Sequence, residues 1–327
     1  MVSARSVTSF FHAQSSTVAL LLVACVCTFF AWHYDVVMPD SRNMGVGLES
    51  ANLWFPFGLP SATLNITANA AIALFIIYIN RAFNVLRSLT ALVATMFLAM
   101  QIAMPRVLCR FNDGSMLALV MLMCAALLFS VFGNRHGQKR IFLAFCLLGW
   151  MAFTRIAYLF YVPVLLGGCV QMRVFSPRDI LAALIGVITP AWIMFGFGLV
   201  DWREISFAGL TGGWQWYGGQ DSVRLMVVSG FTILTGTFFT VANLLKILSY
   251  NSRVRAFNGF FTLLFIATAL LTVVNYSNFT FYIPLLDCMA AYQVGHFFTY
   301  RRSPRSFIPV LLLVLTYFGF YLWALLR

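Results

Sequence analysis

The chain has 327 residues, a formal net charge of +12, 61% hydrophobic residues and only 9% charged residues. A soluble domain carries about a quarter charged residues, so this composition excludes an ordinary soluble enzyme or binding module. The basic excess does not indicate nucleic-acid binding, because Lys and Arg collect in the cytoplasmic loops of membrane proteins. We therefore expect residues 1–327 to form a single integral membrane domain, with no separate soluble domain.

Apolar segments follow one another along the whole chain, mostly with short loops between them. A helix that spans the hydrocarbon core needs about 20 apolar residues, and fewer when its flanking side chains reach the interface. Arg155 and Pro163 interrupt the fifth and sixth segments, so the region 141–174 is either two full spans or a re-entrant hairpin. The pattern predicts an all-α transmembrane bundle of about eleven spans, at 17–34, 61–80, 88–105, 115–132, 141–157, 160–174, 180–200, 225–248, 256–274, 279–298 and 307–326.

The charged residues of the loops predict the orientation of this bundle. With the N-terminus inside, the outer side holds 7 of the 21 basic residues and the inner loops hold the other 14. Because Lys and Arg favour the cytoplasmic side, we predict the N-terminus inside and the C-terminus outside. The loop acids show the opposite bias, with Asp179 inside and seven outside. The outer acids are Asp35, Asp40, Glu49, Asp113, Asp201, Glu204 and Asp221.

The first long outer loop, about 35–60, carries three candidate catalytic acids, Asp35, Asp40 and Glu49. Multi-span glycosyltransferases that use lipid-linked sugars place a catalytic base in the first outer loop. A general base must lie within reach of the group that it deprotonates. A loop acid by itself does not define an active site.

Asp287 is the one acidic residue that falls inside a predicted span. An ionisable group in lipid is costly, so it is expected to face the bundle interior or a wet cavity. In the second predicted span Ser61, Asn65 and Asn69 recur every four residues and share one helix face. We interpret Asp287, Asn65 and Asn69 as an intramembrane polar site that lines a cavity open to the outside. The alternative is a structural pair between Asp287 and one of the two asparagines.

The second long outer loop, about 201–224, contains the segment TGGWQWYGGQD at 211–221. Trp214, Trp216 and Tyr217 lie between two glycine pairs and close to Asp221, which suits a stacking platform for a sugar or another flat ligand. The alternative is a loop that rests on the membrane with its aromatic rings among the headgroups. Small and polar residues that recur every three to four positions in the eighth predicted span indicate close helix packing. They are Ser229, Thr232, Gly236, Thr240 and Asn243.

The sequence contains no recognisable signature of catalysis or cofactor binding. Walker loops, dinucleotide fingerprints and GxSxG motifs are absent. His33 lies on the outer side of the predicted topology, while His12, His136 and His296 lie on or near the inner side, so the four cannot converge on one metal. The seven cysteines form no CxxC pair. We expect no metal and no cofactor.

Three motifs carry a resemblance to known proteins: INRAFNVLR (79–87), FYVP (160–163) and RVFSPRD (173–179), the last leading into GVITP (186–190). Through them the region from about Asn65 to Gly198 resembles an uncharacterised family of bacterial polytopic inner-membrane proteins. The chain departs from the family at Val162, where a second proline is typical, and at Pro177, where tryptophan is frequent. The resemblance implies a multi-pass protein of the bacterial inner membrane. Some members are named as carotene-cleaving oxygenases, but an iron centre needs several converging ligands, which the histidines here do not supply.

Three functions are compatible with these features. The first is an outward-facing site for a lipid or glycan, in a carrier or an envelope-assembly component. The second is a lipid-linked glycosyltransferase, and the third is an ion-coupled transporter, a class that usually shows several intramembrane charges and internal repeats. The expected partners are membrane lipid, a lipid-linked glycan or envelope-assembly proteins.

Overall fold

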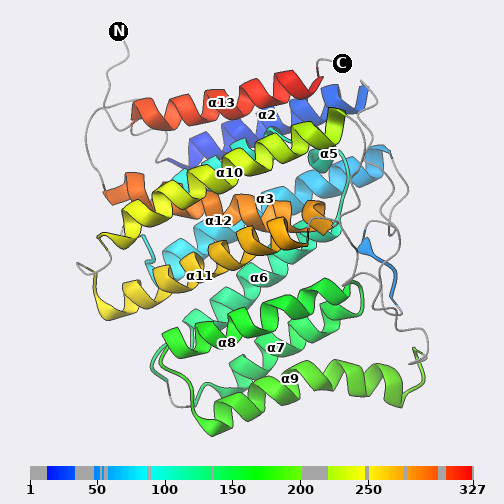
Figure 1. The fold of residues 1–327 in the computed structure, drawn as a ribbon, viewed down its shortest axis with the longest axis vertical. Helices are drawn as coiled ribbons and strands as arrows, with labels where there is room; N and C mark the ends of the chain where they lie inside the picture. The colour runs from blue at the N-terminus through cyan, green and yellow to red at the C-terminus, as the bar shows by residue number, and fades with distance from the viewer. Residues whose placement is uncertain are drawn as a thin grey trace.

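The computed structural model describes residues 13–33, 48–51, 54, 58–86, 88, 90–134, 136–200, 220–246, 250–275, 278–300 and 307–325. Within these ranges the regular structure is entirely helical, and every predicted apolar segment overlaps a helix. The helices lie side by side with similar axis directions, from α13 and α2 at one edge to α9 at the other (Figure 1). The elements are α2 (Gln14–His33), α3 (Leu59–Phe83), α4 (Leu92–Ile102), α5 (Pro105–Leu108), α6 (Asp113–Phe129), α7 (Gln138–Ala152), the 3₁₀ helix η2 (Ile156–Tyr161), α8 (Val162–Gln171), α9 (Pro177–Gly196), α10 (Gln220–Leu244), α11 (Ser252–Val274), α12 (Phe279–Tyr300) and α13 (Phe307–Leu325).

Six of the described helices are long and apolar enough to cross a membrane, namely α2, α3, α9, α10, α11 and α13. Their outward surfaces carry many exposed large apolar side chains, such as Leu74, Trp192 and Leu234. In water such a surface would drive aggregation, whereas in lipid it is the expected exterior. The prediction of an all-helical protein with membrane-spanning helices is confirmed at this level.

The remaining segments are shorter or less apolar. With 11 residues, α4 is about 16 Å long, roughly half of the hydrocarbon core. A turn at Ala103 and Met104 separates it from α5, so the helix inside the predicted span 88–105 ends before the span does. A second break lies at Arg155, whose extended backbone (φ −159°, ψ 119°) separates α7 from η2 and α8.

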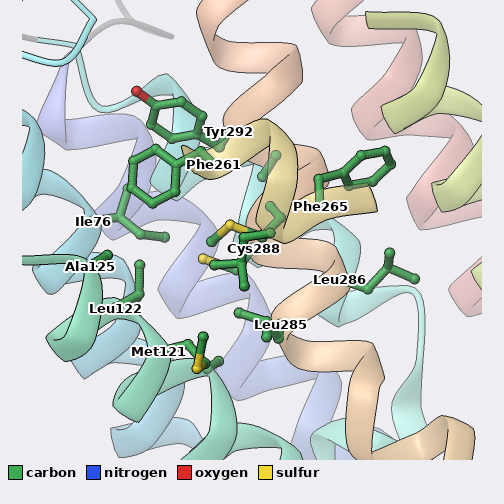
Figure 2. Close-up of a cluster of buried hydrophobic side chains, with 14 of the residues drawn as sticks. Ile76, Met121, Leu122, Ala125, Phe261, Phe265, Leu285, Leu286, Cys288 and Tyr292 are labelled. Atoms are coloured by element: carbon green, nitrogen blue, oxygen red, sulfur yellow. The ribbon is translucent and has the colours of Figure 1, made fainter. Parts of the chain in front are cut away.

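Two buried segments form the centre of the bundle. Every residue of 91–105, which includes α4, and every residue of 281–296 in α12 is buried. Against α12 pack α4, α6, α10 and α11. Figure 2 shows Ile76, Met121 and Phe261, which come from three different helices, around Leu285 and Cys288 of α12. Because neighbouring helices shield α12 from lipid, this helix can carry polar residues that a lipid-facing helix cannot.

The motifs that carry the family resemblance have clear structural roles. Ser176 caps α9 in a capping box with Asp179, and Pro177 occupies the first turn of that helix. A Cβ on Gly186 would lie 2.7 Å from the backbone oxygen of Phe142, and one on Gly149 would lie 2.9 Å from that of Val187. These glycines therefore allow α7 and α9 to approach closely, as small residues do between membrane helices.

Candidate functional site

A buried ion pair joins the start of α6 to the break after α7. Asn112 caps α6 by accepting a 3.0 Å hydrogen bond from the Ser115 N–H, which places Asp113 in the first turn. Arg155 Nη1 donates to Asp113 Oδ2 over 2.9 Å, and the side chains are 7% and 1% exposed. Such a pair can persist away from water because both partners make further hydrogen bonds.

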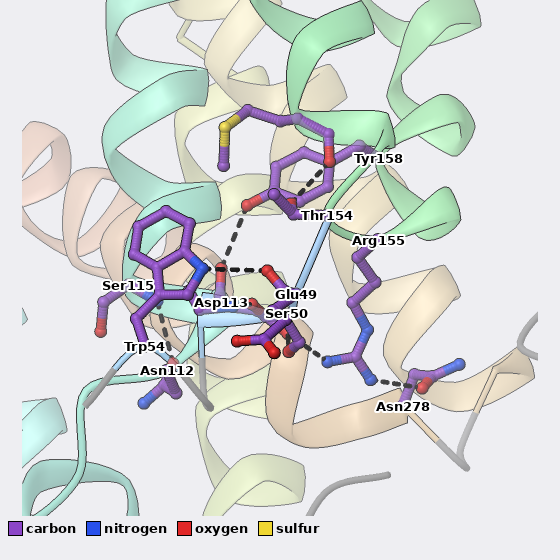
Figure 3. Close-up of polar contacts among 12 residues, drawn as sticks. Glu49, Ser50, Trp54, Asn112, Asp113, Ser115, Thr154, Arg155, Tyr158 and Asn278 are labelled. Carbon is purple, nitrogen blue, oxygen red and sulfur yellow. Dashed lines mark hydrogen bonds and ion pairs between the residues drawn. The ribbon is translucent and has the colours of Figure 1, made fainter. Parts of the chain in front are cut away.

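Those further bonds come from two other segments (Figure 3). Ser50 Oγ donates to Asp113 Oδ2 over 2.5 Å, and the Ala51 N–H donates to Oδ1 over 2.6 Å. Arg155 Nη2 donates to Asn278 Oδ1 over 2.6 Å. The cluster of Ser50, Ala51, Asp113, Arg155 and Asn278 therefore ties the segment 48–51 and the start of α12 to α6, which is a structural role.

Asn65 of α3 forms hydrogen bonds with the short helix α5 and with α6, next to this cluster. Its Nδ2 donates to the carbonyl oxygens of Val107 and Leu108 over 2.9 and 2.8 Å, and its Oδ1 accepts from Ser115 Oγ over 2.8 Å. Carbonyls at the end of α5 thereby gain the partners that an interrupted helix lacks. Asn69, one turn further along α3, is 2% exposed, and its amide atoms have no hydrogen-bond partner in the described part of the chain.

Asp287 lies in the middle of α12 with 0% exposure. Gln101 Nε2 of α4 donates to Asp287 Oδ2 over 2.7 Å. Asp287 Oδ1 and Gln101 Oε1 have no hydrogen-bond partner among the described residues. The hydrogen bonds thus join Asp287 to Gln101, while those of Asn65 go to α5 and α6. Gln101 was not singled out from the sequence, although it is a polar residue inside an apolar segment.

The small and polar residues that recur along α10 contribute to helix packing, as predicted. Thr232 Oγ1 lies 3.2 Å from the Tyr317 hydroxyl of α13. Asn243 Nδ2 donates to the Gln293 carbonyl of α12 over 2.9 Å. A Cβ on Gly236 would lie 2.4 Å from the Phe265 ring of α11, so only glycine fits there without a shift.

A small pocket of about 20 Å³ opens at the end of the bundle where α5, the start of α10 and the end of α13 meet. Arg106 and Arg224 line it together with apolar side chains that include Met104, Leu225 and Val228. Arg224 Nη1 donates to the Ala324 carbonyl over 3.3 Å, and its guanidinium lies 5.6 Å from the Trp323 ring centroid. We call this the two-arginine pocket. Two guanidinium groups beside apolar walls suit an anionic group attached to an apolar chain.

The remaining candidates are placed as follows. Glu49 is exposed, and its backbone oxygen accepts a 2.9 Å hydrogen bond from Trp54 Nε1. Asp221 lies in the first turn of α10. The rest lie outside the residues that the structure describes; they are Asp35, Asp40, Trp214, Trp216 and Tyr217.

The buried Cys109 thiol and the grouping of His, Cys, Asp and Glu side chains bear on nucleophilic and metal chemistry. Burial raises the pKa of the Cys109 thiol to about 12, so this thiol stays protonated at neutral pH and is a poor nucleophile. In the part of the chain that the structure covers, no three His, Cys, Asp or Glu side chains gather as a metal site would require. The chain matches no protein-family model, no curated protein and no solved structure.

Proposed function

We propose that this chain is a multi-pass protein of the bacterial inner membrane whose two-arginine pocket binds the phosphate of a lipid or lipid-linked glycan at the outer face. In this proposal the bundle keeps the eleven predicted segments, of which the short α4 covers only about half of the hydrocarbon core, with the N-terminus inside and the C-terminus outside. The inner-membrane family suggested by the sequence motifs is part of the same proposal.

The arrangement of the helix ends supports this orientation. Ala13, at the start of α2, lines a second pocket together with Arg81 and Ala91, which lies at the start of α4. The other end of α4 reaches the two-arginine pocket, where α13 also ends. The first and last helices thus begin and end on opposite sides, as an odd number of passes requires (Figure 1). The bias of basic residues towards the N-terminal side makes the two-arginine pocket the outer one.

The observation that carries the proposal is the pairing of Arg106 with Arg224 in one pocket that has apolar walls. Guanidinium groups bind phosphate oxygens through two parallel hydrogen bonds. Basic pockets between membrane helices bind lipid head groups for the same reason. The apolar side chains of Met104, Leu225 and Val228 provide a surface for the first methylenes of an acyl or prenyl chain.

Lipid binding tests the proposal directly. The full chain, purified in uncharged detergent, is mixed with phosphatidylglycerol, a polyprenyl phosphate or zwitterionic phosphatidylcholine, and bound lipid is measured by native mass spectrometry. We expect the two anionic lipids to bind and phosphatidylcholine not to. The double variant R106Q/R224Q should weaken binding at least about tenfold, because a hydrogen bond to a charged group contributes about 1.5–3 kcal/mol.

Arg81→Gln is the matched control, since Arg81 is exposed and lines the pocket at the opposite end of the bundle. Equal lipid binding by the wild type and the double variant would overturn the proposal. Arg224 would then have the structural role of fixing the end of α13. Preference for the polyprenyl phosphate over phosphatidylglycerol would identify a polyprenyl-linked carrier, rather than bulk phospholipid, as the ligand.

A lipid-linked glycosyltransferase is the second candidate, and one observation favours it. Glu49 is exposed, while its neighbour Ser50 is buried and bonded to Asp113. The backbone next to Glu49 is thus anchored, and a general base must lie within reach of the proton that it abstracts. In this case Glu49→Gln would abolish sugar transfer from a polyprenyl-linked donor without changing lipid binding. Undiminished transfer by this variant would exclude Glu49 as the base.

A further inference from the structure

The Asp287–Gln101 pair has fewer hydrogen-bond donors than an ionised carboxylate requires. An ionised carboxylate has about four acceptor positions and no donor. At Asp287 the described structure supplies one donor, Gln101 Nε2. Both Asp287 Oδ1 and Gln101 Oε1 are acceptors that lack a donor among the described residues. An ionised Asp287 would therefore be a buried charge with a single hydrogen bond, a costly arrangement.

The groups around Asp287 do not offset a negative charge. The titratable groups that interact electrostatically with Asp287 are Tyr317 of α13 and Cys288 of α12. Both are weak acids that are neutral at neutral pH. The sequence of α4 contains no titratable residue. On α10 and α11 the described basic residues lie in the first two turns; they are Arg224, Arg253 and Arg255.

The acid of α6, Asp113, is itself paired with Arg155, and the other titratable group of that helix is the Cys124 thiol. Among the described side chains of α4, α6, α10, α11 and α13, none therefore supplies a positive charge that pairs with Asp287. A proton on Asp287 reduces the number of acceptors that lack a donor, because it turns one carboxylate oxygen into a donor.

We propose that Asp287 and Gln101 form a proton-binding site at the centre of the bundle, with Asp287 as the neutral carboxylic acid in the structure described here. Release of the proton to water leaves a carboxylate that this packing does not stabilise. Deprotonation therefore favours a rearrangement of α4 against α12 that admits water or another donor. The site is independent of the two-arginine pocket, and it fits a protein whose conformation responds to a transmembrane proton gradient.

α12 contains a position at which such a rearrangement can occur. Pro284, three residues before Asp287, has no N–H to donate to the carbonyl of Thr280, which weakens the helix there. The backbone of Gly114 in α6 packs against this proline, and a Cβ at Gly114 would lie 2.7 Å from Pro284 Cδ. The proline thus lies within one turn of the proton-binding carboxyl, at a contact that only glycine allows.

Infrared spectroscopy of the full chain in a detergent without ester groups tests the proposal. The carbonyl stretch of a protonated carboxylic acid is distinct from the bands of carboxylates. We expect this band at neutral pH in the wild type, its loss as the pH is raised, and its loss in Asp287→Asn. It should persist in the control Glu49→Gln, which removes an exposed acid. A spectrum without the band, or a band unchanged in Asp287→Asn, would overturn the proposal.

A second measurement needs no variant that might fail to fold. The lipid-soluble reagent dicyclohexylcarbodiimide modifies protonated carboxyls in apolar surroundings, and mass spectrometry locates the label. We expect label on Asp287 and none on Asp113, whose carboxylate is paired with the Arg155 guanidinium. Added sodium should not protect Asp287. Protection by sodium would mean that the site binds a metal cation, and label on Asp113 but not Asp287 would reverse the assignment.

Discussion

Asp113 and Asp287 are both buried acids, with 1% and 0% exposure, but their surroundings differ. Asp113 accepts hydrogen bonds from a guanidinium, a hydroxyl and a backbone N–H, whereas Asp287 accepts one bond from an amide. The first carboxylate is compensated in charge and hydrogen bonding, and it fastens three segments together. The second has a single hydrogen bond and no paired cation among the described residues, which is the basis of the proton-binding site proposed above.

Position in the bundle accounts for this difference. Asp113 starts α6, where the break at Arg155 and the segment 48–51 supply nonhelical backbone and polar side chains. Asp287 lies in mid-helix, where the backbone groups of neighbouring helices are already hydrogen-bonded within those helices. Only side chains can reach it, and among the described residues Gln101 is the one that donates a hydrogen bond.

The largest effect is expected from breaking the ion pair at Arg155. Arg155→Met leaves the Asp113 carboxylate buried without a cation, which costs about 3–5 kcal/mol. We expect a sharp fall in thermal stability in detergent and in the yield of folded protein. Arg178→Met, at an exposed position of α9, is the control. A variant as stable as this control would show that Asp113 does not depend on Arg155.

A smaller effect is expected at the Asp287–Gln101 pair. Asp287→Leu leaves the buried Gln101 amide without its acceptor and should cost about 1–3 kcal/mol, so the protein still inserts and folds. The double variant D287L/Q101L should regain most of this stability, because replacing both partners by apolar groups can be nearly neutral. Thermal unfolding of the two variants in one detergent is the measurement, and an additive loss in the double variant would contradict the expectation.

The same site is expected to matter more for function than for stability. Asp287→Leu and Asp287→Asn should both abolish activity in genetic complementation at matched expression, since neither can exchange a proton. Full activity of Asp287→Asn would show that the ionisable group is not needed.

The smallest effect is expected from removing one of the three hydrogen-bond donors of the Asp113 carboxylate. Ser50→Ala takes away the hydroxyl bonded to Asp113 Oδ2 but leaves Arg155 and the Ala51 N–H in place. A cost of about 0.5–1.5 kcal/mol is expected, with faster hydrogen exchange at residues 48–51. An exchange rate unchanged from wild type would mean that the backbone bond alone holds this segment.

The sequence by itself determined the class of structure. Apolar segments of sufficient length predict membrane helices because hydropathy is averaged over neighbouring residues along the chain. The start of α9 was also readable locally, since Ser176, Pro177 and Asp179 form a helix-start signal within four positions. Asp287 stood out because an acid inside an apolar segment is costly wherever its partners lie.

The partners themselves were decided by the tertiary structure. Gln101 and Asp287 are 186 residues apart, and Arg155 and Asn278 are 123 apart. The two-arginine pocket joins residues near 106, 224 and 324. Hydropathy also did not show that α4 ends at Ile102 or that Asn65 of α3 binds the carbonyls of Val107 and Leu108 in α5. Helix pairing in lipid depends on close packing and hydrogen bonds between distant segments, and no local periodicity of a single sequence encodes which helices meet.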